Sequence, residues 1–196
     1  MDAKDLNDKL DRLDKMLDKM SKAVEEGNPV LNMPSASGMI ADCQTDGIVL
    51  LSSLIEACQA KGIPAWIDGR SLLAACRTQN LLPWETEFEI GLFDSGWTEL
   101  NASDILQSIG CSMDGGKIHS AAEPEFGRIK PEIVPRVWIV DKATCHLEFG
   151  GQTVWTVESC ILPLSKATLN GMELPSPCNA WSILEAEFGS GWQKIV

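Results

Sequence analysis

An alternating row of carboxylates follows a glycine turn and a short apolar segment in the first half of the chain. The row is Glu85, Glu87 and Glu89, and a strand period of two would place all three on one face, opposite Phe88. Carboxylates held side by side on a strand repel one another unless a cation lies between them, and magnesium and manganese prefer hard oxygen ligands. The spacing therefore predicts a site for Mg²⁺ or Mn²⁺. A solvated acidic sheet face is the alternative interpretation.

The segment just before the row supplies the elements that would position it. Residues 64–68 are predicted to form a short buried strand that Gly69 breaks, and Ser71 can cap a helix that runs to Arg77. The N-terminus of such a helix favours an anion, because its backbone N–H groups are unpaired there. Gly69 and Ser71, at the start of this helix, are therefore candidate phosphate ligands. The chain then turns at 80–83 and enters the acidic strand.

At these residues the chain resembles the LicD/fukutin family of phosphotransferases, which belongs to the nucleotidyltransferase-fold superfamily. The resemblance spans residues 45–192 and is thin between 96 and 135. The matching segments are Gly69-Arg70-Ser71, Leu72-Leu73-Ala74, Ala75-Cys76, Arg77, Leu82-Pro83-Trp84, Glu87-Phe88-Glu89, Leu174-Pro175-Ser176-Pro177, residues 181–187, Phe188-Gly189 and Trp192.

The resemblance implies an α/β (α+β) fold, with a nucleotidyltransferase-like mixed sheet flanked by helices. It also implies a metal-dependent transfer of a phospho-alcohol, of the phosphocholine or ribitol-phosphate type, from a CDP-linked donor to a glycan hydroxyl. Metal-binding and catalytic carboxylates would be Glu87, Glu89 and Asp141, with Mg²⁺ or Mn²⁺ as cofactor; Asp141 ends an apolar strand over 136–141, and Glu148 is the fallback. The implied substrate-binding residues are Gly69, Arg70, Ser71, Arg77 and Trp84.

Three departures from the family pattern leave other functions open. The paired aspartates are Glu87 and Glu89 here, the second glycine is Arg70, and the glycine after the two leucines is Ala74. A two-metal site tolerates only a spacing of roughly 3.5–4 Å between ions, and longer carboxylates change that spacing. Arg70 either crowds the phosphate turn or donates a forked contact of its own. A catalytically degenerate binding module, and nucleotidyl instead of phospho-alcohol transfer, are the competing hypotheses.

The chain is predicted to have three parts. Residues 1–27 carry leucines at heptad spacing and predict an amphipathic helix, 28–44 read as a linker, and 45–196 form the nucleotidyltransferase-like domain. The first helix either docks on its own domain or forms a homodimer or partner contact. Inside the domain, Thr45 or Asp46 would cap a helix ending near residue 60, and residues 121–135 would form a loop.

Composition limits the function classes. With 196 residues, of which 44% are hydrophobic, the chain can build one core, and its formal charge of −12 argues against nucleic-acid binding, which needs clustered Lys and Arg. We expect no signal peptide, no apolar run long enough to span a bilayer, and hence a cytoplasmic location. The seven cysteines lack paired metal-ligand spacing and are expected to be reduced thiols.

Overall fold

The computed structural model describes residues 36–122, 128–142 and 144–194. The helix predicted for residues 1–27 lies outside them. The elements are α2 Ala36–Ala60, β1 Ala65–Ile67, α3 Gly69–Arg77, β2 Glu87–Phe93, α4 Asp94–Ala102, α5 Ile105–Ser108, β3 Cys111–Asp114, β4 Lys117–Ser120, β5 Glu132–Asp141, β6 Thr144–Phe149, β7 Gln152–Val157, α6 Glu158–Ile161, β8 Ser165–Leu169, β9 Met172–Ser176, α7 Ala180–Phe188 and a 3₁₀ turn Trp192–Lys194.

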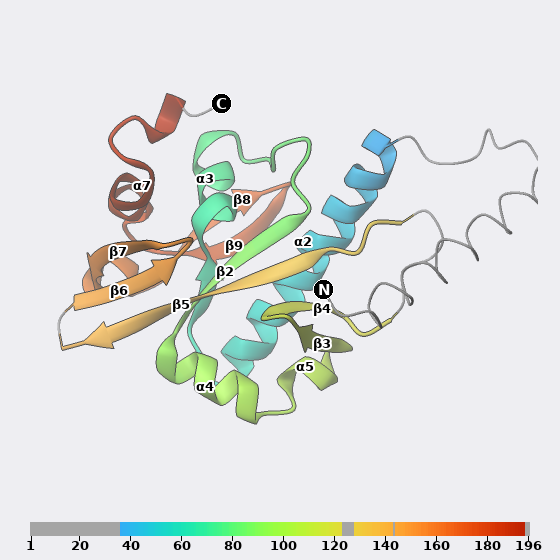
Figure 1. Cartoon of the computed structure of the whole chain (residues 1–196), viewed down its shortest axis with the longest axis horizontal. Coiled ribbons are helices and arrows are strands. Elements are labelled where there is room, and N and C mark those ends of the chain that lie inside the picture. Colours follow the sequence, from blue (N-terminus) through green and yellow to red (C-terminus); the bar gives the residue numbers. More distant parts are fainter. Residues whose placement is uncertain (1–35, 123–127, 143, 195–196) are drawn as a thin grey trace, which may run out of the picture. The chain divides into compact units, whose positions relative to one another are not determined.

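The main sheet is mixed, as the sequence predicted. Its strand order is β1-β2-β5-β4-β3, and β6 and β7 extend it beyond the second half of β5. Only β2 and β5 pair in parallel; the other neighbours in this sheet are antiparallel. Figure 1 shows these two long strands in the centre of the domain, with α3 and α7 on one side of them in this view and α4 on the other. The strands β8 and β9 form a separate two-stranded sheet.

Helix α2 covers the apolar face of β2. Phe88 and Ile90 are fully buried, and Gly47 of α2 lies so close to the Phe88 ring that an added Cβ would be 2.1 Å from it. Phe88 and Ile90 therefore lie opposite the carboxylates of the strand, as the alternating pattern predicted. Leu51, Leu54 and Ile55 of the helix join the same core.

The predicted start of this helix was wrong. It begins at Ala36, so residues 36–44 are helical and do not belong to the linker predicted for 28–44. Thr45 lies inside the helix, where its hydroxyl donates to the Ala41 carbonyl and caps nothing. The small and apolar residues after Pro34 allow the helix to extend, and burial of its face against the sheet stabilises it.

Helix α2 is also long and apolar enough, by length and composition alone, to cross a membrane. No such segment was expected from the sequence. In this domain its apolar face packs in the protein core, as Leu51, Leu54 and Cys58 show by their full burial. One helix of this kind is weak evidence for a membrane span, because a core helix satisfies the same test.

Two other boundaries differ from prediction. Residues 121–135 were expected to be a loop, but β5 already begins at Glu132 because its backbone pairs with β2. The acidic strand expected from Glu85 to Ile90 runs instead from Glu87 to Phe93. In both cases strand pairing set the ends of the element, which the local residue pattern does not encode.

Candidate active site

The glycine turn brings the start of α3 against the acidic strand. Gly69 has φ +48°, in the left-handed region that favours glycine, and a Cβ added to it would lie 1.7 Å from Oε2 of Glu89. Residue 69 therefore has to be glycine for two reasons, its backbone conformation and the carboxylate packed on it. The turn thus leaves room for the carboxylate of Glu89 to pack directly on the backbone of residue 69.

Ser71 holds the strand to the helix. Its hydroxyl accepts the backbone N–H of Glu89 at 2.8 Å, and the serine is 1% exposed. The expected capping role is wrong, because the N-cap residue is Asp68 and no side chain caps this helix end. Ser71 is also too deeply buried to contact a donor phosphate in this structure.

Glu89 is the most buried member of the acid row, the set Glu85, Glu87 and Glu89. It is 1% exposed and accepts three hydrogen bonds. Arg70 donates two of them, from its backbone N–H at 2.7 Å and from Nε at 3.0 Å. Nη1 of Arg136 donates the third, at 3.1 Å. Both carboxylate oxygens of Glu89 are therefore already paired with arginine.

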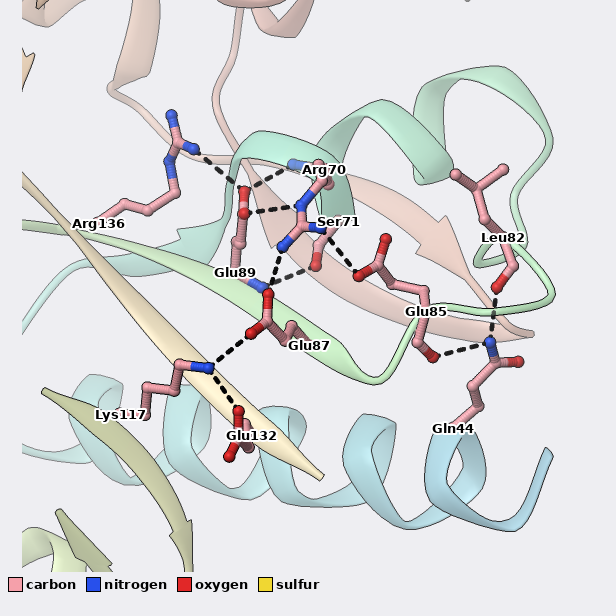
Figure 2. A network of polar contacts seen from close by, with 10 residues as sticks. All are labelled: Gln44, Arg70, Ser71, Leu82, Glu85, Glu87, Glu89, Lys117, Glu132 and Arg136. Carbon is pink, nitrogen blue, oxygen red and sulfur yellow. Dashed lines mark hydrogen bonds and ion pairs between the residues drawn. The ribbon is translucent and has the colours of Figure 1, made fainter. Parts of the chain in front are cut away.

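Arg70 contacts every member of the acid row. Figure 2 shows the three carboxylates directed at its guanidinium, with Nη1 3.2 Å from Glu85, Nη2 2.7 Å from Glu87 and Nε 3.0 Å from Glu89. Burial by itself lowers the pKa of Arg70, but the hydrogen bonds and charges of the three glutamates outweigh it and the pKa is raised. The sequence predicted a cation between these carboxylates, and the structure places a guanidinium there.

Lys117 pairs with the outer side of the row. Its Nζ lies 2.6 Å from Oε1 of Glu87 and 2.6 Å from Oε2 of Glu132 (Figure 2). Hydrogen bonds from Lys117 and then Arg70 lower the pKa of Glu87. Burial, partly opposed by Arg70, raises the pKa of Glu85. Gln44 of α2 holds the backbone at Glu85 in place, since its amide donates to the Glu85 carbonyl at 3.0 Å.

A second group of charges lies deeper, beside Glu89. We call Asp68, Arg136, Trp138 and Glu187 the buried cluster. Arg136 is 1% exposed; its Nε lies 3.2 Å from Asp68 and its Nη2 2.8 Å from Glu187 of α7. The indole N–H of Trp138 donates to Asp68 at 2.7 Å. The residue pattern assigned no site role to any of the four, although an arginine inside an apolar strand was a signal that a buried carboxylate partner exists.

Burial dominates the protonation of this cluster. It raises the pKa of Glu187 to about 7, against the opposing charge of Arg136, and it raises the pKa of Asp68 despite Arg136 and Trp138. Among the described residues, Asp68 Oδ1, Glu187 Oε2 and Arg136 Nη2 are buried without a hydrogen-bond partner, although Nη2 lies at ion-pair distance from Glu187. The cluster thus holds more carboxylate than its single arginine can neutralise.

Asp141, the predicted third carboxylate, does not reach the row. Val134 is the parallel partner of Glu89, and Asp141 is seven positions further along the same strand, roughly 23 Å at 3.3 Å per residue. The odd spacing also turns its side chain to the other face of the sheet. The fallback Glu148 is exposed on β6. The β5 side chain that contacts Glu89 is Arg136, a cation.

Arg77 and Arg70 line one small cavity. They lie two turns apart on α3, and the cavity, about 170 Å³, also contacts Glu85 and Phe188. No ion pair of Arg77 is found within the described ranges. Trp84 is 62% exposed in the turn before β2 and does not line this cavity. Of the predicted substrate contacts, Arg70 and Arg77 are thus the two that share a cavity.

The side chains as arranged do not fit a divalent metal site. In the part of the chain that the structure describes, no group of three His, Cys, Asp or Glu side chains could hold a metal ion. Both oxygens of Glu87 and both of Glu89 are bonded to Arg70, Lys117 or Arg136. The predicted ligand set Glu87, Glu89 and Asp141 is not brought together.

Comparison with known proteins identifies the family. The sequence profile described as LicD/FKTN/FKRP, nucleotidyltransferase domain, matches residues 62–179, which is more than half of the chain. The chain belongs to this family. The match contains the glycine turn, the acid row, β5 and the start of the C-terminal segment, so the resemblance noted in the sequence is confirmed.

Two curated relatives match this chain at low sequence identity. The ribitol-5-phosphate transferase FKTN of Homo sapiens is 24% identical over 157 residues, and so is that of Macaca fascicularis. The match covers 75% of this chain and 33% of each relative. The chain therefore spans about a third of the length of the relatives it matches.

Proposed function

We propose that this chain carries a transferase domain that moves a phospho-alcohol from an activated donor to an acceptor hydroxyl. The family match over residues 62–179 is the observation that carries the proposal. The two relatives named as ribitol-5-phosphate transferases favour ribitol phosphate over phosphocholine as the transferred group. A CDP-linked donor and a glycan acceptor complete the proposed reaction.

The cavity beside α3 is the proposed place for the donor diphosphate. Arg77 and Arg70 supply guanidinium groups that can donate paired hydrogen bonds to phosphate oxygens. Leu73, Leu81 and Phe188 give the same cavity apolar walls. Arg70 would thus meet the donor on one side while it holds the acid row on the other.

The transfer itself is proposed as one in-line displacement at phosphorus. The acceptor oxygen forms the new P–O bond, the bond to the CMP oxygen breaks, and CMP leaves with the electron pair. Glu85 lines the cavity, and its raised pKa makes it the row member best suited to accept the acceptor's proton. No step is assigned to the Mg²⁺ or Mn²⁺ expected from the sequence, because the carboxylate oxygens that would hold it are bonded to arginine and lysine side chains.

The proposal is tested by titrating the full chain with CDP-ribitol, CDP-choline and CTP in a calorimeter, and by measuring CMP and pyrophosphate release with a hydroxyl acceptor. We expect CDP-ribitol to bind and Arg77→Ala to weaken it by about ten-fold or more. Lys166→Ala, an exposed cation of β8, is the matched control and should bind like the unmodified chain.

The outcomes separate the hypotheses. CMP release supports phospho-alcohol transfer, whereas pyrophosphate release from CTP indicates nucleotidyl transfer. Failure of a folded chain to bind any of the three nucleotides would overturn the proposal and favour the binding module.

A further inference from the structure

The acid row is neutralised from within the chain. Its three carboxylates face three cationic side chains at ion-pair distance: Arg70 contacts all of them, Lys117 contacts Glu87, and Arg136 contacts Glu89. The mutual repulsion that would attract a divalent ion to such a row is therefore compensated by fixed charges of the protein. This differs from the metal site that the residue pattern predicts.

A divalent ion would have to displace those contacts. Magnesium requires oxygen ligands at close to octahedral geometry, about 2.0–2.1 Å from the ion. Arg70 occupies the position between the carboxylates, with 2.7 to 3.2 Å from its nitrogens to the three glutamates. A guanidinium and an ion cannot share that position, so binding of one excludes the other.

The Arg70 side chain can move away from the carboxylates more easily than the Arg136 side chain can. The Arg70 side chain is 41% exposed and starts in the first turn of α3, whereas Arg136 is 1% exposed and is held by carboxylates from the turn before α3, from β2 and from α7. Arg136 also stacks over the Phe149 ring at 4.5 Å. Of the two arginines that contact the row (Figure 2), Arg70 is thus the one that can exchange.

We propose that Arg70 is a built-in cation that closes the Glu85, Glu87 and Glu89 row to divalent ions, and that the row becomes a divalent-cation site when this guanidinium is removed. Residue 70 then determines whether the site uses an internal or a bound cation. The inference does not rest on the proposed transfer, because it is tested by cation binding alone.

The experiment is a Mn²⁺ titration of the full chain, followed by the electron paramagnetic resonance signal of the free ion. We expect weak or undetectable binding by the unmodified chain and binding tighter by about ten-fold or more in Arg70→Ala. Glu87→Gln placed on top of Arg70→Ala should abolish the gain. Arg77→Ala removes one positive charge from the same helix without exposing the row, and should show no gain.

Two results would overturn the proposal. One is tight Mn²⁺ binding by the unmodified chain that Glu87→Gln abolishes, since the row would then hold an ion with Arg70 present. The other is no gain in Arg70→Gln, which keeps a polar side chain of similar reach without the charge and guards against unfolding of the alanine variant. Circular dichroism of each variant confirms that it is folded before titration.

Discussion

The acid row and the buried cluster share Glu89 but differ in how their charges are held. At the outer end of the row, Glu87 and its partners Arg70 and Lys117 are each about one-third or more exposed, and these contacts come from long side chains that water can replace. In the cluster, Asp68 and Arg136 are 0% and 1% exposed, and no solvent replaces a lost partner. The same residue types therefore form ion pairs that water can replace at the acid row and ion pairs that belong to the protein core in the buried cluster.

Removing the arginine of the buried cluster should have the largest effect. Arg136→Met leaves the buried carboxylates of Asp68 and Glu187 without their cation, and breaking a buried pair costs about 3–5 kcal/mol. Urea unfolding measures the loss. Lys166→Met, in an exposed pair, should change stability by less than about 0.5 kcal/mol. If Arg136→Met lowered the free energy of unfolding by less than about 1 kcal/mol, the charges of the buried cluster would be no more important for stability than those of the acid row.

The pH dependence of the buried cluster should come next. Glu187 has its pKa raised from 4.5 to about 7, so the folded state binds its proton more tightly than the unfolded state does. The stability that this tighter proton binding gives the folded state is fully present below pH 4.5. It is lost as the pH rises to 7, by at most about 1.4 kcal/mol for each pH unit.

Glu187→Gln should remove this dependence. Relative to the variant, the unmodified chain loses stability across the window from pH 4.5 to 7 and shows a constant difference above it. Urea unfolding of both proteins at several pH values measures the difference. Parallel stability curves would show that Glu187 titrates at its ordinary pKa.

The smallest effect is expected in the acid row. Lys117→Met removes two ion pairs whose side chains are 38%, 32% and 42% exposed, and exposed pairs contribute about 0.5 kcal/mol. The loss should shrink further at high salt, because exposed charges are screened. Urea unfolding of Lys117→Met and of the unmodified chain at low and high salt measures both the loss of stability and its dependence on salt. A loss as large as that of Arg136→Met would contradict the contrast between the two regions.

Local pattern was sufficient to predict much of the fold. The break at Gly69, the helix ending at Arg77 and the two faces of the acidic strand follow from residue type and spacing, and the structure shows each of them. Element ends were predicted less well, because pairing and burial set them: α2 begins at Ala36 and β5 at Glu132.

The site was predicted only in part. That Glu85, Glu87 and Glu89 face the same way follows from their alternation, but the cation that contacts them is the Arg70 guanidinium and not the metal ion that the sequence predicted. Lys117, Glu132 and Glu187 were missed because each comes from an element distant in the sequence.

By itself the sequence determined the family, the glycine turn and the face on which the carboxylates lie, since these depend on neighbours within a few residues. Only the tertiary structure decided which charges meet them. The parallel register of β2 and β5 puts Arg136 on the same face as Glu89 and within hydrogen-bond reach of it. The same register puts Asp141 at the far end of the strand and on the other face of the sheet. The packing of α3 on β2 directs Arg70 back onto the row. Long-range register is set by the burial of whole elements, which no short segment encodes.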